Sequence, residues 1–107
     1  MSPRRIGKVD ANQSEIVNAL RSCGAFVVLT HTLGKGVPDI FVLWSNRWTP
    51  IEIKTVGGKL TRDEGQWWDA AGYGAPIIAH NDQEAMLACG IPIDLPFTDK
   101  GGSDDNT

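Results

Sequence analysis

The chain of 107 residues contains little cysteine and no long apolar segment. Cys23 and Cys89 are too few for a disulfide scaffold, so we interpret both as reduced thiols in a cytoplasmic protein. No apolar run approaches the ~20 residues that a membrane helix needs. The charged N-terminus is not followed by the apolar stretch of a secretory signal. We therefore expect a protein that has no membrane partner and is not exported.

The chain also lacks internal repeats, and its length leaves room for one core only. Its 41% hydrophobic and 21% charged residues exclude a wholly disordered chain. We expect three parts: a basic N-terminal arm over residues 1–9, a folded domain over residues 10–93 and a flexible acidic tail over residues 94–107.

A positive net charge is missing as well, because the formal net charge is −3. Taken alone, this value argues weakly against a nucleic-acid partner. However, residues 91–107 contain four aspartates and one lysine, which leaves residues 1–90 neutral. The acidic excess therefore belongs to the tail and does not count against DNA binding by the folded part.

Hydrophobic periodicity, cap residues and glycines divide the chain into seven elements. Asp10 or Asn12 is expected to cap the first helix, and Thr61 with Glu64 forms a capping box for the second. The predicted order is α-β-β-β-α-β-α, with a hairpin turn at residues 45–47. This order predicts an α/β fold with a mixed four-stranded sheet flanked by helices, in which the last strand runs parallel to an earlier one.

Three charged residues are expected to meet on two neighbouring strands. Alternation places Glu52 and Lys54 on one face of their strand, and the hairpin brings Asp39 opposite residues 52–54. The preceding strand is apolar on both faces, so we expect a sheet covered on both sides, which would enclose these charges. Two adjacent carboxylates repel unless a cation lies between them, and oxygen ligands suit Mg²⁺ or Mn²⁺. With a lysine beside them, they are suited to metal-assisted phosphodiester hydrolysis. The simpler alternative is a small α/β protein in which Glu52 and Lys54 are solvated.

The same residues resemble a known family signature. Residues 36–40 (Gly-Val-Pro-Asp-Ile), the hairpin, and residues 51–54 (Ile-Glu-Ile-Lys) resemble the PD-(D/E)XK nuclease motif. Residues 34–36 before it, and residues 59–61 and Gln66 after it, resemble the VRR-NUC branch, which is similar to the Holliday-junction resolvases. The similarity covers nearly the whole predicted domain, and it implies a restriction-endonuclease-like αβββαβ core.

The resemblance implies roles for individual residues. Asp39, Glu52 and Glu15 match acidic metal ligands, the main-chain carbonyl of Ile53 matches a further ligand, and Lys54 matches the catalytic lysine. Gln66 matches a polar residue that faces the site in related enzymes, although some relatives carry a tyrosine where this chain has Ala70. Glu15 and Gln66 have simpler interpretations as exposed helix residues. The expected cofactor is Mg²⁺, for which Mn²⁺ substitutes.

We expect the phosphates of a DNA partner to contact basic residues and one histidine, because phosphate neutralisation supplies most non-specific affinity. Each is an ordinary surface residue when taken singly. The expected contacts are Arg4, Arg5, Lys8, His31, Lys35, Lys59 and Arg62.

The resulting hypothesis is a Mg²⁺-dependent, structure-selective DNA endonuclease that acts on branched DNA such as Holliday junctions. The chain has no separate recognition module, and its four tryptophans favour a homodimer. Two alternatives stay open: a restriction-type or general DNA-nicking nuclease, and a non-catalytic DNA-binding module on the same fold.

Overall fold

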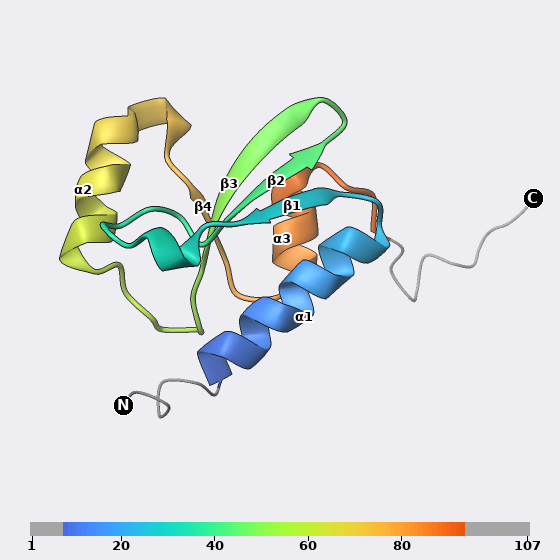
Figure 1. The fold of residues 1–107 in the computed structure, drawn as a ribbon, viewed down its shortest axis with the longest axis horizontal. Coiled ribbons are helices and arrows are strands. Elements are labelled where there is room, and N and C mark those ends of the chain that lie inside the picture. Colours follow the sequence, from blue (N-terminus) through green and yellow to red (C-terminus); the bar gives the residue numbers. More distant parts are fainter. Residues whose placement is uncertain (1–7, 94–107) are drawn as a thin grey trace, which may run out of the picture.

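The computed structural model describes residues 8–93 as an α/β fold in the predicted element order (Figure 1). Arg4, Arg5 and the predicted acidic tail lie outside these residues, and so does the side chain of Lys8. No helix within residues 8–93 is long and apolar enough to cross a membrane. The elements are α1 (Lys8–Ser22), β1 (Phe26–Leu29), η2 (His31–Leu33), β2 (Ile40–Trp44), β3 (Arg47–Ile53), α2 (Arg62–Ala71), η3 (Gly72–Gly74), β4 (Ile77–Ala79) and α3 (Asp82–Cys89).

The four strands form one mixed sheet in the order β1-β2-β3-β4. β1, β2 and β3 are antiparallel neighbours, whereas β4 lies parallel to β3, as predicted for a strand that follows a crossover helix. The hairpin turn is one residue shorter than predicted, because Arg47 already pairs with Trp44. Ser45 and Asn46 both have positive φ angles, which matches a two-residue turn with the twist of its strands.

The hydrophobic core lies between one face of the sheet and helices α1 and α3. Figure 1 shows these two helices close together and α2 apart from them. Ile16 and Leu20 of α1 meet Ile40, Val42 and Ile51 of the central strands, and all five are fully buried. Both cysteines are free thiols in this structure, the second of them within the core.

Helix α1 begins at Lys8, ahead of both predicted cap residues, so the prediction that Asp10 or Asn12 caps it was wrong. The side-chain amide of Asn12 instead donates to the main-chain oxygen of His80, 3.2 Å away. This bond ties the first turns of α1 to the end of β4, which lies beside the end of β3.

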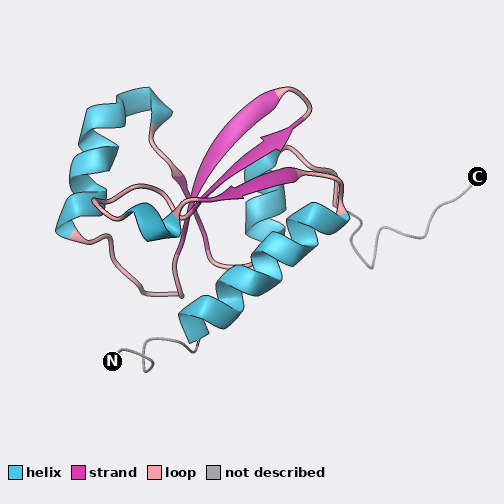
Figure 2. Cartoon of the chain, in the orientation of Figure 1, coloured by secondary structure: helices cyan, strands magenta, loops and turns pink. Residues whose placement is uncertain are grey.

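The opposite face of the sheet is only partly covered, so the prediction of a sheet covered on both sides was wrong. Helix α2 contributes no buried residue, and Figure 2 shows it standing away from the strands. Phe26 and Trp48 on this face are 60% and 51% exposed, and their rings meet edge to face at 6.2 Å. Glu52 is nevertheless only 3% exposed, because the start of α2 lies close to it.

Candidate active site

The register of the hairpin places Asp39 beside the end of β3, as the sequence predicted. Ile40 pairs with Ile51, so Asp39 precedes the ladder at the level of Glu52. The main-chain oxygen of Asp39 accepts a hydrogen bond from Thr30 at 2.9 Å. Its carboxylate Oδ2 accepts one from the peptide N–H of Ile53, also at 2.9 Å. Asp39 is thus held at its backbone by one strand and at its side chain by another.

Lys54 lies between two further carboxylates, those of Glu64 and Glu52. Its Nζ lies 2.8 Å from Oε1 of Glu64 and 3.6 Å from Oε2 of Glu52. The side chains of all three residues are less than a fifth exposed. The sheet and the first turn of α2 therefore bring three carboxylates and one ammonium group together.

The first turn of α2 fixes Glu64 by a second set of contacts. The predicted capping box is confirmed: the Thr61 side chain accepts from the Glu64 N–H, and Glu64 Oε1 accepts from the Thr61 N–H at 2.8 Å. The same oxygen, Oε1, contacts Lys54. Glu64 thus caps the helix and holds the site lysine with one carboxylate.

A close approach between Gly36 and α2 keeps this helix against the site. Gly36 has a φ of +80°, and a Cβ at this position would overlap the main-chain carbonyl of Asp63. Because glycine alone tolerates both the angle and the contact, the loop before Asp39 packs directly on the first turn of α2. This packing sets the distance between the sheet carboxylates and Glu64.

Burial and mutual repulsion disturb the protonation of the two sheet carboxylates. Burial raises the pKa of Glu52 to about 8, helped by a hydrogen bond with Glu64 and by the negative charge of Asp39. Burial also raises the pKa of Asp39, against the Ile53 N–H that lowers it. At neutral pH Glu52 is therefore held largely in its protonated form, which hydrogen-bonds to Glu64.

The pKa values of Lys54 and Glu64 shift in the directions that favour the charged forms, as expected for a close ion pair. Burial favours the neutral form of Lys54, but contacts with Glu64 and Glu52 outweigh it and raise the pKa of the lysine. Burial likewise opposes the charge of Glu64, yet Lys54 and the Thr61 N–H together lower the pKa of this carboxyl. Both groups are therefore charged at neutral pH, and Lys54 stays bound to Glu64.

The chemistry of this donor set fits a hard cation such as Mg²⁺. Carboxylate oxygens are the ligands that Mg²⁺ prefers, and Asp39 and Glu52 supply them at one end of the hairpin. Burial, the hydrogen bond with Glu64 and the charges of Asp39 and Glu64 raise the pKa of Glu52 although Lys54 lowers it. In the present arrangement, no three His, Cys, Asp or Glu side chains within the described part of the chain are placed to hold a metal together.

Among the described residues, Glu15 and Gln66 form no hydrogen bond or ion pair with Asp39, Glu52 or Lys54, and their roles at the site stay predictions. Glu15 is exposed on α1 and lines a separate pocket with Thr55 and His80. Gln66 is exposed on α2 and lines a groove on that helix. At Ile53 the contact with Asp39 is made by the peptide N–H, and a ligand role for its carbonyl stays a prediction.

The basic residues expected to bind DNA surround the site at different elements. Lys35 lies in the loop before Asp39, Lys59 in the loop after β3, and Arg62 at the start of α2, and all three are exposed. His31, in η2, is exposed and within 3.0 Å of Gln13 through its Nδ1. Burial raises the pKa of Asp39, and His31 is among the groups that oppose this shift.

Glu64 is the site residue that the sequence analysis missed. The capping box accounted fully for a glutamate at this position, so no second role was sought. Its position could have indicated the second role, because Glu64 lies in the first turn of the helix that follows the Glu52-Ile53-Lys54 strand. A carboxylate there can reach back toward that strand as well as toward its own cap.

Comparison of the chain with protein-family models, with curated proteins and with solved structures found no match.

Proposed function

We propose that this protein is a metal-dependent phosphodiesterase that cleaves DNA. The observation that supports the proposal best is the meeting of Asp39, Glu52 and Glu64 around Lys54 at the end of β3. Burying carboxylates together is costly, typically several kcal/mol per uncompensated ion, and a stable fold has no need of it. A bound divalent cation would neutralise the carboxylates of such a cluster, which is why we interpret it as a metal site.

Each residue has a distinct role in this proposal. Asp39 uses Oδ2 for the Ile53 N–H, so Oδ1 is the oxygen that acts as a ligand, together with Glu52. Mg²⁺, when bound, supplies Lewis-acid activation of the phosphate and lowers the pKa of an attacking water. The Lys54 ammonium group donates a hydrogen bond to the non-bridging phosphate oxygen, where negative charge develops, and keeps its proton. Glu64 holds Lys54 in that position.

Within this class, we propose a structure-selective DNA endonuclease of the PD-(D/E)XK type, in its VRR-NUC branch. The supporting points are the likeness of residues 36–54 to that motif and the αβββαβ order of the elements. Exposed Lys35, Lys59 and Arg62 provide phosphate contacts near the carboxylates. Branched DNA such as a Holliday junction is the proposed substrate, since one small domain reads the shape of DNA more readily than a long sequence.

The test is a cleavage panel with four-way junction, flap, nicked, duplex and single-stranded DNA, in Mg²⁺, Mn²⁺ or chelator. Wild type should nick at least one branched DNA only with metal, whereas D39A should fall to background and keep its circular dichroism spectrum. D69N, which replaces an exposed aspartate on α2, is the matched control and should cleave like wild type. Full activity of D39A would refute the assignment. A folded wild type that binds DNA but never cleaves it would favour the non-catalytic DNA-binding module.

We also propose that two copies associate, since a junction nuclease needs two sites to cut paired strands. The exposed face that carries Phe26, Leu43 and Trp48 in one row across the sheet supports this proposal. Sedimentation velocity should find a dimer for wild type and a monomer for W48K. A monomeric wild type at micromolar concentration would refute it.

A further inference from the structure

Helix α2 carries Trp67, whose side chain is only partly covered by the rest of the protein. Trp67 is half-buried, although α2 contributes no buried residue to the core. Residues three and four positions along a helix are neighbours on its surface, and here these are Ala70 and Ala71. Two small side chains cannot cover an indole, so the ring keeps an open face.

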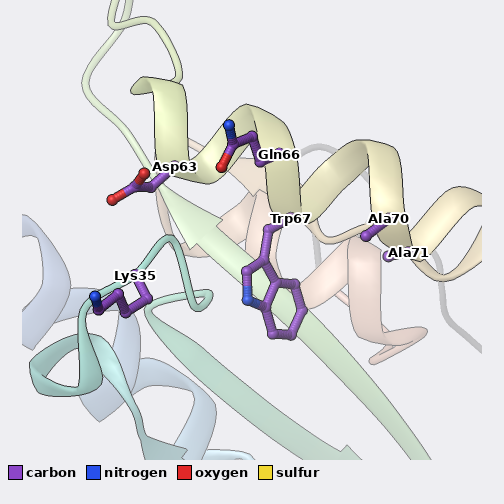
Figure 3. A pocket seen from close by; sticks show the side chains of 6 residues that line it. All are labelled: Lys35, Asp63, Gln66, Trp67, Ala70 and Ala71. Carbon is purple, nitrogen blue, oxygen red and sulfur yellow. The ribbon is translucent and has the colours of Figure 1, made fainter.

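This face lines a groove of about 340 Å³ between α2 and the loop that carries Lys35. Figure 3 shows Trp67 projecting from the helix, with Asp63 one turn earlier and Lys35 on the facing loop. Pockets that take small ligands begin at about 300 Å³, so this groove has room for one planar ring system. Its apolar part is the indole with the two alanines, and its charged groups lie at the end near Gly36.

The groove opens next to the candidate active site. Gly36 packs on the main chain of Asp63 and Glu64, and Glu64 holds Lys54. The groove and the ion pair of Glu64 with Lys54 therefore both include residues of the first turn of α2.

We propose that this groove takes one unpaired base of the DNA strand, stacked on Trp67, next to the scissile phosphate. The proposal rests on the proposed nuclease function and specifies its substrate: DNA with at least one base free to leave the helix. Charge complementarity supports a nucleotide as the occupant. The Lys35 ammonium matches a backbone phosphate, and the Asp63 carboxylate accepts a hydrogen bond from an exocyclic amino group of the base.

The test measures binding in chelator, where cleavage cannot interfere. Fluorescence anisotropy compares a fully paired duplex with the same duplex carrying one unpaired adenine. Wild type should bind the second more tightly, and W67L should lose that preference by about 5- to 100-fold, the range of base–aromatic stacking. W67F keeps an aromatic face and should keep the preference. W68L, at the adjacent half-buried tryptophan that does not line the groove, is the matched control and should behave like wild type.

A second variant tests the groove without removing the indole. A70L should fill the space beside Trp67 and reduce binding of the unpaired duplex while binding of the paired duplex stays unchanged. If wild type shows no preference, or if W67L and A70L retain it, the base groove is refuted. Should the same protein still cleave DNA of the panel with metal, the nuclease proposal stands. A protein that binds neither duplex and cleaves no DNA of the panel refutes both.

Discussion

Replacing Glu52 by glutamine tests directly whether the carboxylates converge as the structure has them. Glutamine has the shape of a protonated glutamate, and its amide can donate the hydrogen bond to Glu64 that the protonated form makes. The variant E52Q therefore copies the protonated state at every pH. Below the pH at which Glu52 ionises in the unfolded chain, wild type and E52Q should be about equally stable.

The two proteins should diverge as the pH rises. The pKa of Glu52 is about 8 in the folded protein, against 4.5 for an unperturbed glutamate. A carboxyl whose pKa is raised by folding stabilises the fold below the unfolded pKa, and this contribution is lost as the pH rises through the folded pKa. Between pH 4.5 and 8, wild type should therefore lose stability that E52Q keeps. A pKa difference of one is worth about 1.4 kcal/mol, so the loss is on the order of 3–5 kcal/mol.

Urea unfolding followed by tryptophan fluorescence from pH 4 to 9, in chelator, measures this difference. E15Q removes an exposed carboxylate and controls for the loss of one charge. Parallel stability curves for wild type and E52Q, or a less stable E52Q above pH 8, would refute the convergence of charges. Adding Mg²⁺ at pH 8 should then stabilise wild type and leave E52Q unchanged, because a ligand stabilises only a state that binds it.

Further predictions concern the segments that hold α2 against the site. G36A should destabilise the fold by more than about 1 kcal/mol and impair cleavage, because its Cβ would meet Asp63. G57A has a similar positive φ but no atom near its Cβ, so it should cost stability without affecting cleavage. Activity retained in G36A would show that this contact does not position the site. T61A should cost about 1 kcal/mol in urea unfolding through loss of the cap, and an unchanged midpoint would argue against the capping box.

The sheet part of the site could be predicted because it depends on periodicity alone. Alternation along a strand fixes which face Glu52 and Lys54 occupy, and the hairpin register then places Asp39. Local signals also predicted the capping box of Thr61 with Glu64. Each of these features is determined by a few neighbouring residues or by one hairpin turn.

The helical part could not be predicted from the same signals. Helix positions two apart point about 200° from each other, so Glu64 and Gln66 cannot both face Lys54. Which of them does so depends on the rotation of α2, and that rotation is set by the contact of Gly36 with Asp63. The prediction of a covered sheet failed for a similar reason: β2 is apolar on both faces, but nothing local determines where α2 lies.

The two contacts of Lys54, with Glu64 and with Glu52, differ in length and connect α2 to β3. At 2.8 Å, the bond to Glu64 is supported by a lowered carboxyl pKa and by the helix cap, whereas Glu52 lies 3.6 Å away with a raised pKa. When Glu52 gives up its proton to become a ligand, Lys54 can therefore stay on Glu64 and remain positioned for the phosphate. Glu64 belongs to α2, so the helix that holds the lysine is also the one that presents Trp67. In the proposed nuclease, DNA that stacks a base on Trp67 would therefore lie beside the helix that holds the catalytic lysine.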